Sequence, residues 1–476
     1  MKPSAPAFRQ PPDAAAFEGP ALVLGLGSSG CAAARLLRAR GVEVTALDES
    51  DHPGPVAAAE QLRAEGIHAR AGARGPLPAG PFRVAVVSPG LDPERSPWIA
   101  ELRARNTPIR AEFELGWLAR GETRVLAVTG SNGKSSVVKL IAESLANTGH
   151  ASAPCGNYGT PVCAQAMAAP VETWVMEVSS FQLQLARDFA PEISVLLNLQ
   201  PNHLDRHGTM EAYREAKTRI FQHSGPGASV VVPASLAALA DTARARGARI
   251  RTFGVDGQTD ADALWQPGRI VRRDPAAAVD IQGSYFDNPV LGAAAAAAVA
   301  AVDLFGGDVE GVGRSARNFE PLPHRMQPVG EGRGVRWIND SKATSTAALQ
   351  AALRMLGGTR GIRLLAGGRP KESNFDSVNK MLASCVRKLY LFGECAERLH
   401  DVWSAIAPAE CFPSLTEAAE QAARDAEAGE IILLSPACTS FDQFRNFEER
   451  GDAFASLARR WCGGRECGQG GSRKSA

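Results

Sequence analysis

Short apolar segments alternate with helical stretches along almost the whole chain, and this alternation constrains the fold more than any other feature. Apolar segments of strand length occur at 21–25, 42–48, 82–90, 123–130, 173–180, 193–200, 335–340, 362–368, 388–394 and 430–437. Between them lie stretches such as 32–40 and 135–149, whose apolar residues recur at helical spacing. Strands that alternate with helices are typical of parallel sheets, so the sequence predicts an α/β fold.

The pattern falls into three blocks, which we predict to be three domains. The first covers residues 20–113, the second 114–320 and the third 321–462, and the Gly/Ser-rich end, 463–476, is predicted to be a disordered tail. Between 225 and 290 the alternation is weak, so strands and helices are hard to assign there. A chain of 476 residues is long enough for several domains.

Charge and composition exclude several classes of function. With 52 Lys and Arg against 51 Asp and Glu, the net charge is +1, and only 6% of residues are aromatic, so we expect no nucleic-acid partner. No uncharged apolar run reaches the ~20 residues of a membrane span, and the N-terminal segment lacks the apolar region of a secretory signal. The nine Cys are scattered without a C-x2-C pair, which favours reduced thiols. We therefore expect a cytoplasmic protein without membrane insertion, and a monomer.

Unusual polar segments follow the predicted strands. They include GLGSSG (25–30), TGSNGKSS (129–136), NDSKAT (339–344), GGRPKES (367–373) and SPACTSFD (435–442). In open α/β sheets, ligands bind beyond the carboxyl ends of the strands. Three sheets that each present such loops predict a ligand site shared between domains.

The segment TGSNGKSS joins a strand to a helix and is the sharpest chemical signal. Gly130 and Gly133 allow backbone N–H groups to approach an anion, Lys134 can reach the outer phosphates, and Ser135 stands where a hydroxyl ligates Mg²⁺. The spacing departs from G-x4-G-K-[ST], because the first Gly is Gly130. A glycine turn that merely starts a helix is the alternative, but the Lys and Ser at its end favour nucleotide binding.

GLGSSG, with Asp48 at the end of the next strand, fits the G-x-G-x-x-G fingerprint of dinucleotide-binding domains. The same geometry can hold another nucleotide diphosphate. Together with the Lys-containing loop, it predicts a Rossmann-like N-terminal domain and a central P-loop-type ATPase domain. The four strand-like segments of the third block predict a Rossmann-like C-terminal domain.

Three further candidates lie in the second block. Glu177 ends an apolar strand, where a carboxylate is costly unless it is paired or bound to a metal. His203 follows the next strand in NHLDRHG, although a structural histidine is the ordinary alternative. Lys217 flanks an apolar helical stripe, and a lysine reaching to the surface is its alternative.

The third block holds a carboxylate, hydroxyls and an ammonium within NDSKATS (339–345). His324 and Arg325 stand at its start, where an arginine can contact phosphate. For the segment 435–454, a helix cap followed by ordinary surface charge is the alternative to a functional motif.

Taken together, these motifs resemble the Mur ligase family, and most closely its glutamate-adding branch. GLGSSG, SPG, TGSNGKSS, GNYGTP, EVSSFQLQ, NHLDRHG, EAYREAKTRIF, PHR, WINDSKAT, GGRPK and SPACTSFDQFRNFEERGDAF occur in the family's order. They cover nearly the whole chain except the first twenty residues and the tail.

The resemblance implies a peptidoglycan-precursor enzyme that joins D-glutamate to UDP-N-acetylmuramoyl-L-alanine with ATP, through an acyl phosphate. It implies ATP contacts by Gly130, Ser131, Asn132, Gly133, Lys134, Ser135, Ser136, Asn288, Arg325 and Asp340. For the UDP substrate it implies Gly27, Ser28, Ser29, Asp48, Ser88, Pro89, Gly90 and Asn157. For glutamate it implies Lys342, Thr344, Lys371, Ser440 and Phe447.

The resemblance also implies two Mg²⁺ ions. Ser135 and Glu177 match the ligands of one ion, and His203 and Lys217 match positions that serve the second. Lys217 matches a lysine that the family carbamylates, which turns a cation into a carboxylate-like ligand. Lys134, Glu177, His203 and Lys217 are thereby the expected catalytic residues.

The chain departs from the family at a few positions. Leu291 stands where the family has a side chain that helps to recognise adenine, Phe441 replaces a commonly aliphatic residue, and Ser131 replaces the usual Thr. An L-glutamate-adding variant, or another Mur-type ligase, is the alternative within the class. A nicotinamide-dependent oxidoreductase that uses GLGSSG is the remote alternative.

Overall fold

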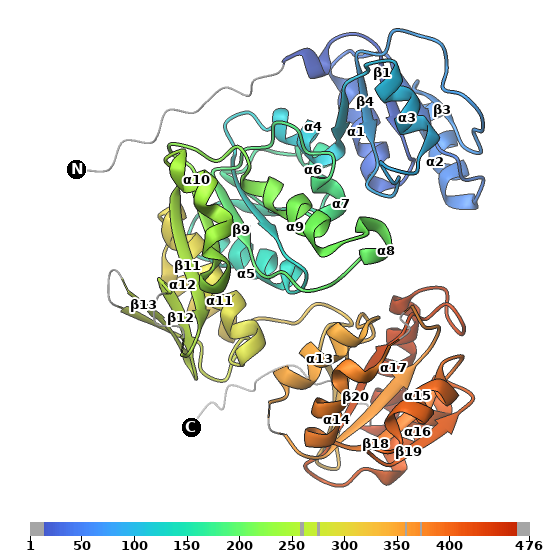
Figure 1. Cartoon of the computed structure of the whole chain (residues 1–476), viewed down its shortest axis with the longest axis vertical. Coiled ribbons are helices and arrows are strands. Elements are labelled where there is room, and N and C mark those ends of the chain that lie inside the picture. Colours follow the sequence, from blue (N-terminus) through green and yellow to red (C-terminus); the bar gives the residue numbers. More distant parts are fainter. Residues whose placement is uncertain (1–13, 258–260, 274–276, 358, 372–373, 464–476) are drawn as a thin grey trace, which may run out of the picture. The chain divides into compact units, whose positions relative to one another are not determined.

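The computed structural model describes residues 14–257, 261–273, 277–357, 359–371 and 374–463. These residues form two compact units (Figure 1). One runs from the first described residue to Gly283 and includes Gly292–Asn318, and the other holds Ser284–Leu291 and the described residues from Phe319 on. The predicted tail, apart from Gly463, lies outside the described residues.

The first sheet is fully parallel, with the strand order β3-β2-β1-β4-β5. Its strands are β1 (Ala21–Leu24), β2 (Val44–Leu47), β3 (His68–Arg70), β4 (Val84–Val87) and β5 (Ile109–Ala111). Its helices are α1 (Ser28–Ala39), α2 (Pro53–Ala64) and α3 (Pro97–Ala104), preceded by a 3-10 turn at Ala14–Phe17. The chain crosses from one side of β1 to the other between β3 and β4, and α/β sheets bind ligands at such a switch point.

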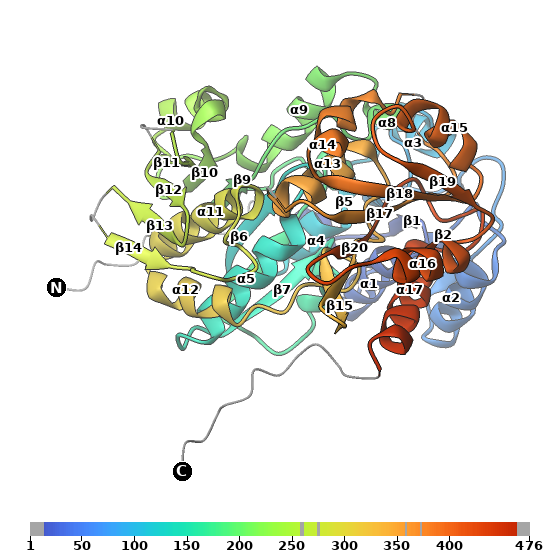
Figure 2. The same cartoon turned by 90° about the horizontal axis from the view of Figure 1, so that it is seen from below.

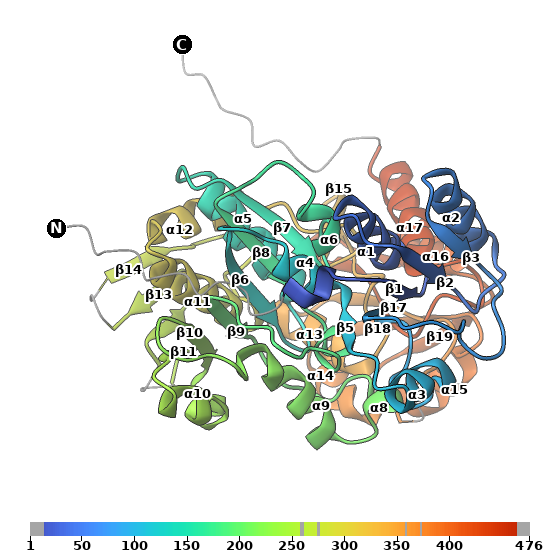
Figure 3. The same cartoon turned by 90° about the horizontal axis from the view of Figure 1, so that it is seen from above.

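Both faces of this sheet are covered, and every residue of its central strands β1 and β4 is apolar and buried. Val23 and Val86 pack with α1 and α2, whereas Leu24 and Val87 pack with Trp98 of α3 on the opposite face. Figure 3 shows α1 and α2 on one side of β1 and α3 on the other. Continuous burial on two faces is the usual state of parallel strands.

A short helix, α4 (Glu112–Leu118), connects the first sheet to the second and is buried along its whole length. Gly116 lets it lie directly against α6 (Val162–Gln165), since a Cβ there would fall 2.5 Å from the Val162 carbonyl carbon. Glu112 accepts a hydrogen bond from the Cys163 backbone N–H at 2.7 Å. Its burial raises the pKa of the Glu112 carboxyl to about 7, against the lowering effect of that hydrogen bond.

The second sheet has the order β14-β13-β12-β11-β10-β9-β6-β8-β7. It is parallel from β7 to β12, whereas β12, β13 and β14 are antiparallel. Its strands are β6 (Arg124–Thr129), β7 (Ser152–Gly156), β8 (Thr173–Glu177), β9 (Ile193–Leu196), β10 (Ser229–Pro233), β11 (Arg249–Val255), β12 (Ala263–Gln266), β13 (Arg269–Arg272) and β14 (Ala277–Asp280). The described residues of the weakly patterned segment 225–290 thus hold five strands.

The helices of this region are α5 (Lys134–Ala146), α7 (Ser180–Leu183), α8 (Leu204–His207), α9 (Met210–Thr218), α10 (Asp241–Ala245), α11 (Pro289–Phe305) and α12 (Val309–Arg317). Short 3-10 segments lie at Arg219–Phe221 and Ala234–Ala240. The outer strand β14 is backed by α12, because Gly313 lets that helix approach Asp280 closely and Arg317 Nη1 donates to the Asp280 carbonyl oxygen at 2.6 Å.

The third sheet has the order β15-β16-β20-β17-β18-β19, with only the β15–β16 pair antiparallel. Its strands are β15 (Gln327–Gly332), β16 (Val335–Asn339), β17 (Ile362–Gly367), β18 (Val386–Phe392), β19 (Ala409–Phe412) and β20 (Ile431–Ala437). Its helices are α13 (Thr346–Met355), α14 (Asn379–Cys385), α15 (Ala396–Trp403), α16 (Leu415–Asp425) and α17 (Phe447–Trp461), with a 3-10 turn at Asp376–Val378.

Alternate residues of the central strands serve two separate cores. Leu364 and Leu389 pack with α13, α14 and α15, while Leu365 and Tyr390 pack with α16 and α17. Figure 2 shows these two helix groups on opposite sides of β17 and β18. The α/β fold class with three largely parallel sheets is confirmed, while the domain boundaries stay predictions.

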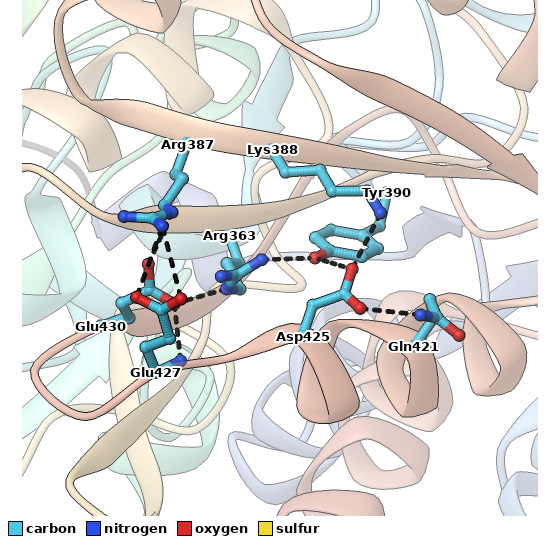
Figure 4. A network of polar contacts seen from close by, with 8 residues as sticks. All are labelled: Arg363, Arg387, Lys388, Tyr390, Gln421, Asp425, Glu427 and Glu430. Carbon is cyan, nitrogen blue, oxygen red and sulfur yellow. Dashed lines mark hydrogen bonds and ion pairs between the residues drawn. The ribbon is translucent and has the colours of Figure 1, made fainter.

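A polar network closes the amino ends of the strands in the third sheet (Figure 4). Arg363, which is 5% exposed, donates from Nε to Glu430 at 2.5 Å and from Nη1 to the Tyr390 hydroxyl at 2.9 Å. Asp425 accepts from that hydroxyl and from Lys388, both at 2.8 Å. These charges lie at the end of the sheet opposite to the loops that the sequence singles out, so their contribution is to stability.

Candidate active site

The loop Gly130–Gly133 joins β6 to α5, as the sequence predicts. Gly133 has φ +81° and Gly130 φ +159°, conformations that favour glycine. A Cβ on Gly130 would lie 2.9 Å from Leu197 Cβ. The Lys134 side chain folds back over the loop, with Nζ 2.9 Å from the Gly130 carbonyl oxygen and 3.2 Å from that of Ser131. The result is a helix N-terminus with a lysine beside it, a geometry suited to phosphate.

Two residues that follow β9 hold this loop, and neither was singled out from the sequence. The Asn198 side chain accepts from Asn132 N at 2.9 Å and donates to Asn132 O at 3.1 Å. Gln200 exchanges hydrogen bonds with Ser131: its backbone N donates to Ser131 Oγ, which donates to its carbonyl, both at 2.9 Å. Asn198 and Gln200 are alternate polar residues just after a buried strand, and this pattern is the sequence signal that could have identified them.

Glu177 lies at the end of β8 and is 1% exposed. Its Oε2 accepts a hydrogen bond from Ser135 Oγ and its Oε1 one from Asn157 Nδ2, both at 2.6 Å. The first residue pair is the predicted ligand set of one Mg²⁺. Carboxylate and hydroxyl oxygens are donors that Mg²⁺ prefers, so this pair fits such an ion.

Lys217 on α9 is 1% exposed, so the alternative of a lysine reaching to the surface is wrong. Its Nζ donates to the Gly130 carbonyl oxygen at 2.8 Å and lies 4.7 Å from the centre of the Tyr213 ring. Burial, followed by the charge of Lys134, lowers the pKa of Lys217 to about 6, although Glu177 acts in the opposite direction.

Tyr213, one turn before Lys217, belongs to the apolar stripe of α9 and is buried. Its hydroxyl donates to Ser131 Oγ at 3.0 Å, so α9 contacts the phosphate-type loop through two side chains. The hydroxyl of a buried tyrosine usually finds such a partner, and this one lies in the loop itself.

His203 precedes α8 with φ +55°, and its ring packs on Phe181 at 4.8 Å between centroids. His207, four residues on, is buried and has Nε2 3.0 Å from Ser180 Oγ. Burial lowers the pKa of His207 to about 4, and the charges of Arg206, His203 and Lys217 act in the same direction. His203 and Lys217 therefore both lie close enough to the His207 ring to affect its protonation.

The loops expected to bind the UDP substrate meet at the β1/β4 switch point. Gly25 packs on Ser88, since a Cβ on Gly25 would lie 2.5 Å from Ser88 Cβ. Gly27 is exposed with open space around its Cα, and α1 begins at Ser28, earlier than the predicted 32–40. Asp48 accepts from Leu26 N at 2.7 Å and from Ser50 N at 2.8 Å, so it holds the glycine-rich loop. Of the other predicted residues here, Ser29 lies in the first turn of α1, Pro89 and Gly90 lie in the turn after β4, and Asn157 lies beside Glu177.

In the other unit, Asp340 follows β16 and is buried. Its carboxylate accepts from Ser435 Oγ at 2.9 Å and from Met326 N at 3.2 Å, and burial raises its pKa to about 7. Arg325 stands in the same turn, where its carbonyl accepts from the Tyr285 hydroxyl at 3.1 Å. Asn288 Oδ1 accepts from Leu291 N at 3.0 Å at the start of α11, so its side chain caps that helix.

Of the residues expected to bind glutamate, Lys342, Thr344, Lys371 and Ser440 lie in loops after β16, β17 and β20, whereas Phe447 begins α17. Lys342 Nζ lies 3.7 Å from the centre of the Phe447 ring. Ser440 is buried, Thr344 is half-buried, and Lys371 and Phe441 are exposed. Of the residues expected to bind glutamate, Lys342 and Phe447 are thereby brought together.

Arg450 was missed, because the charges of 435–454 also fit a solvent-exposed helix. The cap is present, since Asn446 Oδ1 accepts from Glu449 N at 2.8 Å. Arg450, however, is 0% exposed, donates to Ser341 O at 2.8 Å and to Cys438 O at 3.1 Å, and has a pKa lowered to about 10 by burial. It therefore ties two predicted substrate loops together.

Comparisons with known proteins bear on what these loops do. The Mur ligase middle domain matches residues 128–283, and the Mur ligase glutamate ligase domain matches 324–438. A UDP-N-acetylmuramoylalanine–D-glutamate ligase of Frankia casuarinae is 36% identical over 458 residues, which cover 92% of this chain and 94% of that one. A ligase of the same name from Rubrobacter xylanophilus is 38% identical over 454 residues, covering 94% and 99%. The chain belongs to the Mur ligase family.

This Mur ligase is an ATP-dependent, ADP-forming amide ligase, as the motifs predict. The relatives' names place it in the glutamate-adding branch. An NAD(P)-binding Rossmann-like domain matches residues 23–83, which hold β2, β3 and the end of β1, so this match is confined to part of the first sheet.

Solved structures agree with this Mur ligase in fold. The MurF ligase of Thermotoga maritima in complex with ADP has a TM-score of 0.59 at 18% identity, covering 80% of this chain and 89% of that one. MurC of the same organism has a TM-score of 0.57 at 15% identity, covering 92% and 99%. Among the described residues, no helix combines the length and the apolar character needed to cross a membrane.

Proposed function

We propose that this chain joins D-glutamate to UDP-N-acetylmuramoyl-L-alanine at the expense of ATP, in the synthesis of peptidoglycan precursors. The support is the D-glutamate ligase name of relatives that align over 92% of the chain. The local observation that agrees with it is the convergence of Lys134, Lys217 and the Ser135–Glu177 pair on one loop.

The reaction needs activation because a carboxylate is inert toward amines. The γ-phosphoryl group of ATP moves to an oxygen of the alanyl carboxylate, which gives an acyl phosphate and ADP. The unprotonated amine of glutamate then attacks the acyl carbon, and the C–O bond to phosphate breaks. The products are the amide, inorganic phosphate and a proton.

Lys134 and the loop N–H groups bind the phosphates in this proposal. Lys134 Nζ already rests on the loop carbonyls, so a short rotation aims it at a phosphate placed at the start of α5. Positive groups fixed in advance stabilise the charge that moves with the phosphoryl group.

The donor set supports Mg²⁺, and we propose two ions. Ser135 and Glu177 would hold one, and His203 with Lys217 would serve the other. Bound Mg²⁺ supplies charge neutralisation on the phosphates. Lys217 fits only if its amine carries a carboxyl group, because Mg²⁺ prefers oxygen ligands to an amine nitrogen.

Carbamylation of Lys217 has direct physical support. A pKa of about 6 leaves the Lys217 amine largely unprotonated at neutral pH, and a free amine is the form that adds to CO₂. The N–C bond forms, one proton leaves, and an anionic carbamate results. Its oxygens would lie beside the loop that Lys217 now contacts.

For the remaining residues we propose the roles that their match to the Mur ligase motifs implies. Asn288, Arg325 and Asp340 contact the nucleotide, the β1/β4 loops bind the UDP group, and Lys342, Thr344, Lys371, Ser440 and Phe447 surround glutamate. We further propose three domains at the predicted boundaries, a monomer, and a cytoplasmic location.

Phosphate release tests the activity. The purified chain is supplied with UDP-N-acetylmuramoyl-L-alanine, ATP, Mg²⁺ and either D- or L-glutamate. We expect phosphate and an amide product with D-glutamate only. Turnover with L-glutamate instead would establish the alternative enantiomer, and no phosphate with either would overturn the ligase proposal for this substrate.

A further inference from the structure

Arg206 on α8 reaches out of its own helix to the turn after β4. Its Nη1 donates to the Pro89 carbonyl oxygen at 2.9 Å, and its Nη2 donates to the Leu91 carbonyl oxygen at 2.8 Å. The guanidinium carbon lies 4.3 Å from the centre of the Phe181 ring. Burial lowers the pKa of Arg206, against the opposing charges of Asp92 and Asp205.

The turn that Arg206 holds includes the Ser88–Gly90 segment expected at the UDP group. On its other side the turn is fixed by the first sheet: Ser88 N donates to Leu24 O at 2.8 Å, and Gly25 leaves no room between its Cα and Ser88. Leu91 N closes the turn with a 3.1 Å hydrogen bond to Ser88 O. Arg206 therefore supplies the contact from the second sheet's side.

The helix that carries Arg206 is only four residues long and starts directly after His203. A helix this short has little stability of its own, so its contacts determine its position. The Phe181 ring contacts three side chains of this segment. They are the ring of the N-cap residue His203 at 4.8 Å, the ring of His207 at 5.5 Å, and the Arg206 guanidinium. Anything that moves Arg206 along this ring moves the backbone that presents His203.

We propose that Arg206 is a positioning residue that couples the UDP-binding turn to the metal and phosphate side of the active site. When the UDP group fixes the turn, the Pro89 and Leu91 carbonyls fix Arg206, and α8 and His203 are fixed with it. The inference rests on the proposed function and adds a link between two of its sites. An arginine suits this task because its two terminal nitrogens reach separate carbonyls while its flat face packs on the ring.

Coupling between the two ligands is the property to measure. Calorimetry gives the Kd of Mg²⁺ with a non-hydrolysable ATP analogue, with and without saturating UDP-N-acetylmuramoyl-L-alanine. In the native chain we expect the UDP substrate to tighten the analogue's binding, and by reciprocity the analogue to tighten that of the UDP substrate.

In Arg206→Lys and Arg206→Ala we expect the coupling factor to fall toward one. The KM for the UDP substrate should rise about tenfold, because charge-assisted hydrogen bonds are lost. Arg214→Ala, at an exposed arginine of α9, is the matched control and should keep the native coupling. Phe181→Leu removes the shared ring but keeps an apolar side chain. This variant should weaken the coupling although Arg206 itself is not substituted.

A purely structural role would lower the thermal midpoint and leave the coupling factor unchanged. Native coupling in a folded Arg206→Lys or Phe181→Leu variant would overturn the proposal, as would an active native chain without coupling. If the native chain releases no phosphate with either glutamate, the proposed function fails instead, so the two failures are distinguishable.

Discussion

Lys134 and Lys217 share one acceptor: the Nζ atoms of both lie within hydrogen-bond distance of the Gly130 carbonyl oxygen, at 2.9 and 2.8 Å. Two side chains 83 positions apart in sequence are thus brought to one point by the packing of α9 on the loop before α5. The charge of Lys134 is the second cause of the lowered pKa of Lys217, after burial.

Lys134→Ala should lower kcat/KM for ATP at least ~100-fold with the thermal midpoint nearly unchanged, because the proposed role of this lysine is to bind phosphate and its Nζ rests on loop carbonyls rather than in a core. Lys139→Ala is the control on the same helix, where the native lysine pairs with Glu143 at 2.8 Å on the surface. Steady-state phosphate release measures both. Native turnover by Lys134→Ala would refute the role.

Lys217→Ala should be inactive, and short acids such as acetate should restore part of the turnover by placing a carboxylate in the vacated space. Propionate and formate test the dependence on size. If no short acid restores any activity while the variant is folded, the lysine acts as a cation or amine and the carbamate is excluded.

Tyr213→Phe should raise the KM for ATP several-fold with a smaller change in kcat. It keeps the ring beside Lys217 but removes the 3.0 Å hydrogen bond to Ser131 Oγ. A cycle with Ser131→Ala checks the cause: the double variant should be little worse than either single one. Additive losses would show that the two side chains act independently.

Glu112→Gln should change the pH dependence of stability. The folded-state pKa of Glu112 is about 7 against an ordinary 4.5, so its contribution is fully present below pH 4.5 and is lost as pH rises through 7. Relative to the native chain, the variant should gain about 3 kcal/mol of unfolding free energy between pH 4.5 and pH 8. Denaturant titrations at both pH values measure this, and a pH-independent difference would contradict it.

Arg363→Met should cost about 3 kcal/mol of unfolding free energy in the second unit, because it removes one partner of a buried ion pair and leaves Glu430 with Arg387 alone. Arg35→Met, at the more exposed pair with Glu65, is the control and should cost less than about 1 kcal/mol. Equal losses would show that burial of the Arg363 pair has no special effect.

The alternation of strands and helices was sufficient to predict the α/β class and the loops after β1, β6, β8 and β20. Short edge strands such as β3, β5 and β19 were missed, because three or four residues carry too little pattern. The burial of Lys217 and Arg450 also could not be predicted from the sequence. Each stands at the border of an amphipathic helix, where periodicity does not decide which side faces a neighbouring loop, and only the packing of that helix does.

The strand β14 lies at one edge of the second sheet. A nine-stranded sheet ends in strands whose free backbone groups can pair with another copy of the chain. Here the Asp280 carbonyl is already bound by Arg317, and α12 lies against the strand through Gly313. We therefore expect that replacing Arg317 or Gly313 would open this position to strand addition, so that these two residues bear on aggregation of the chain.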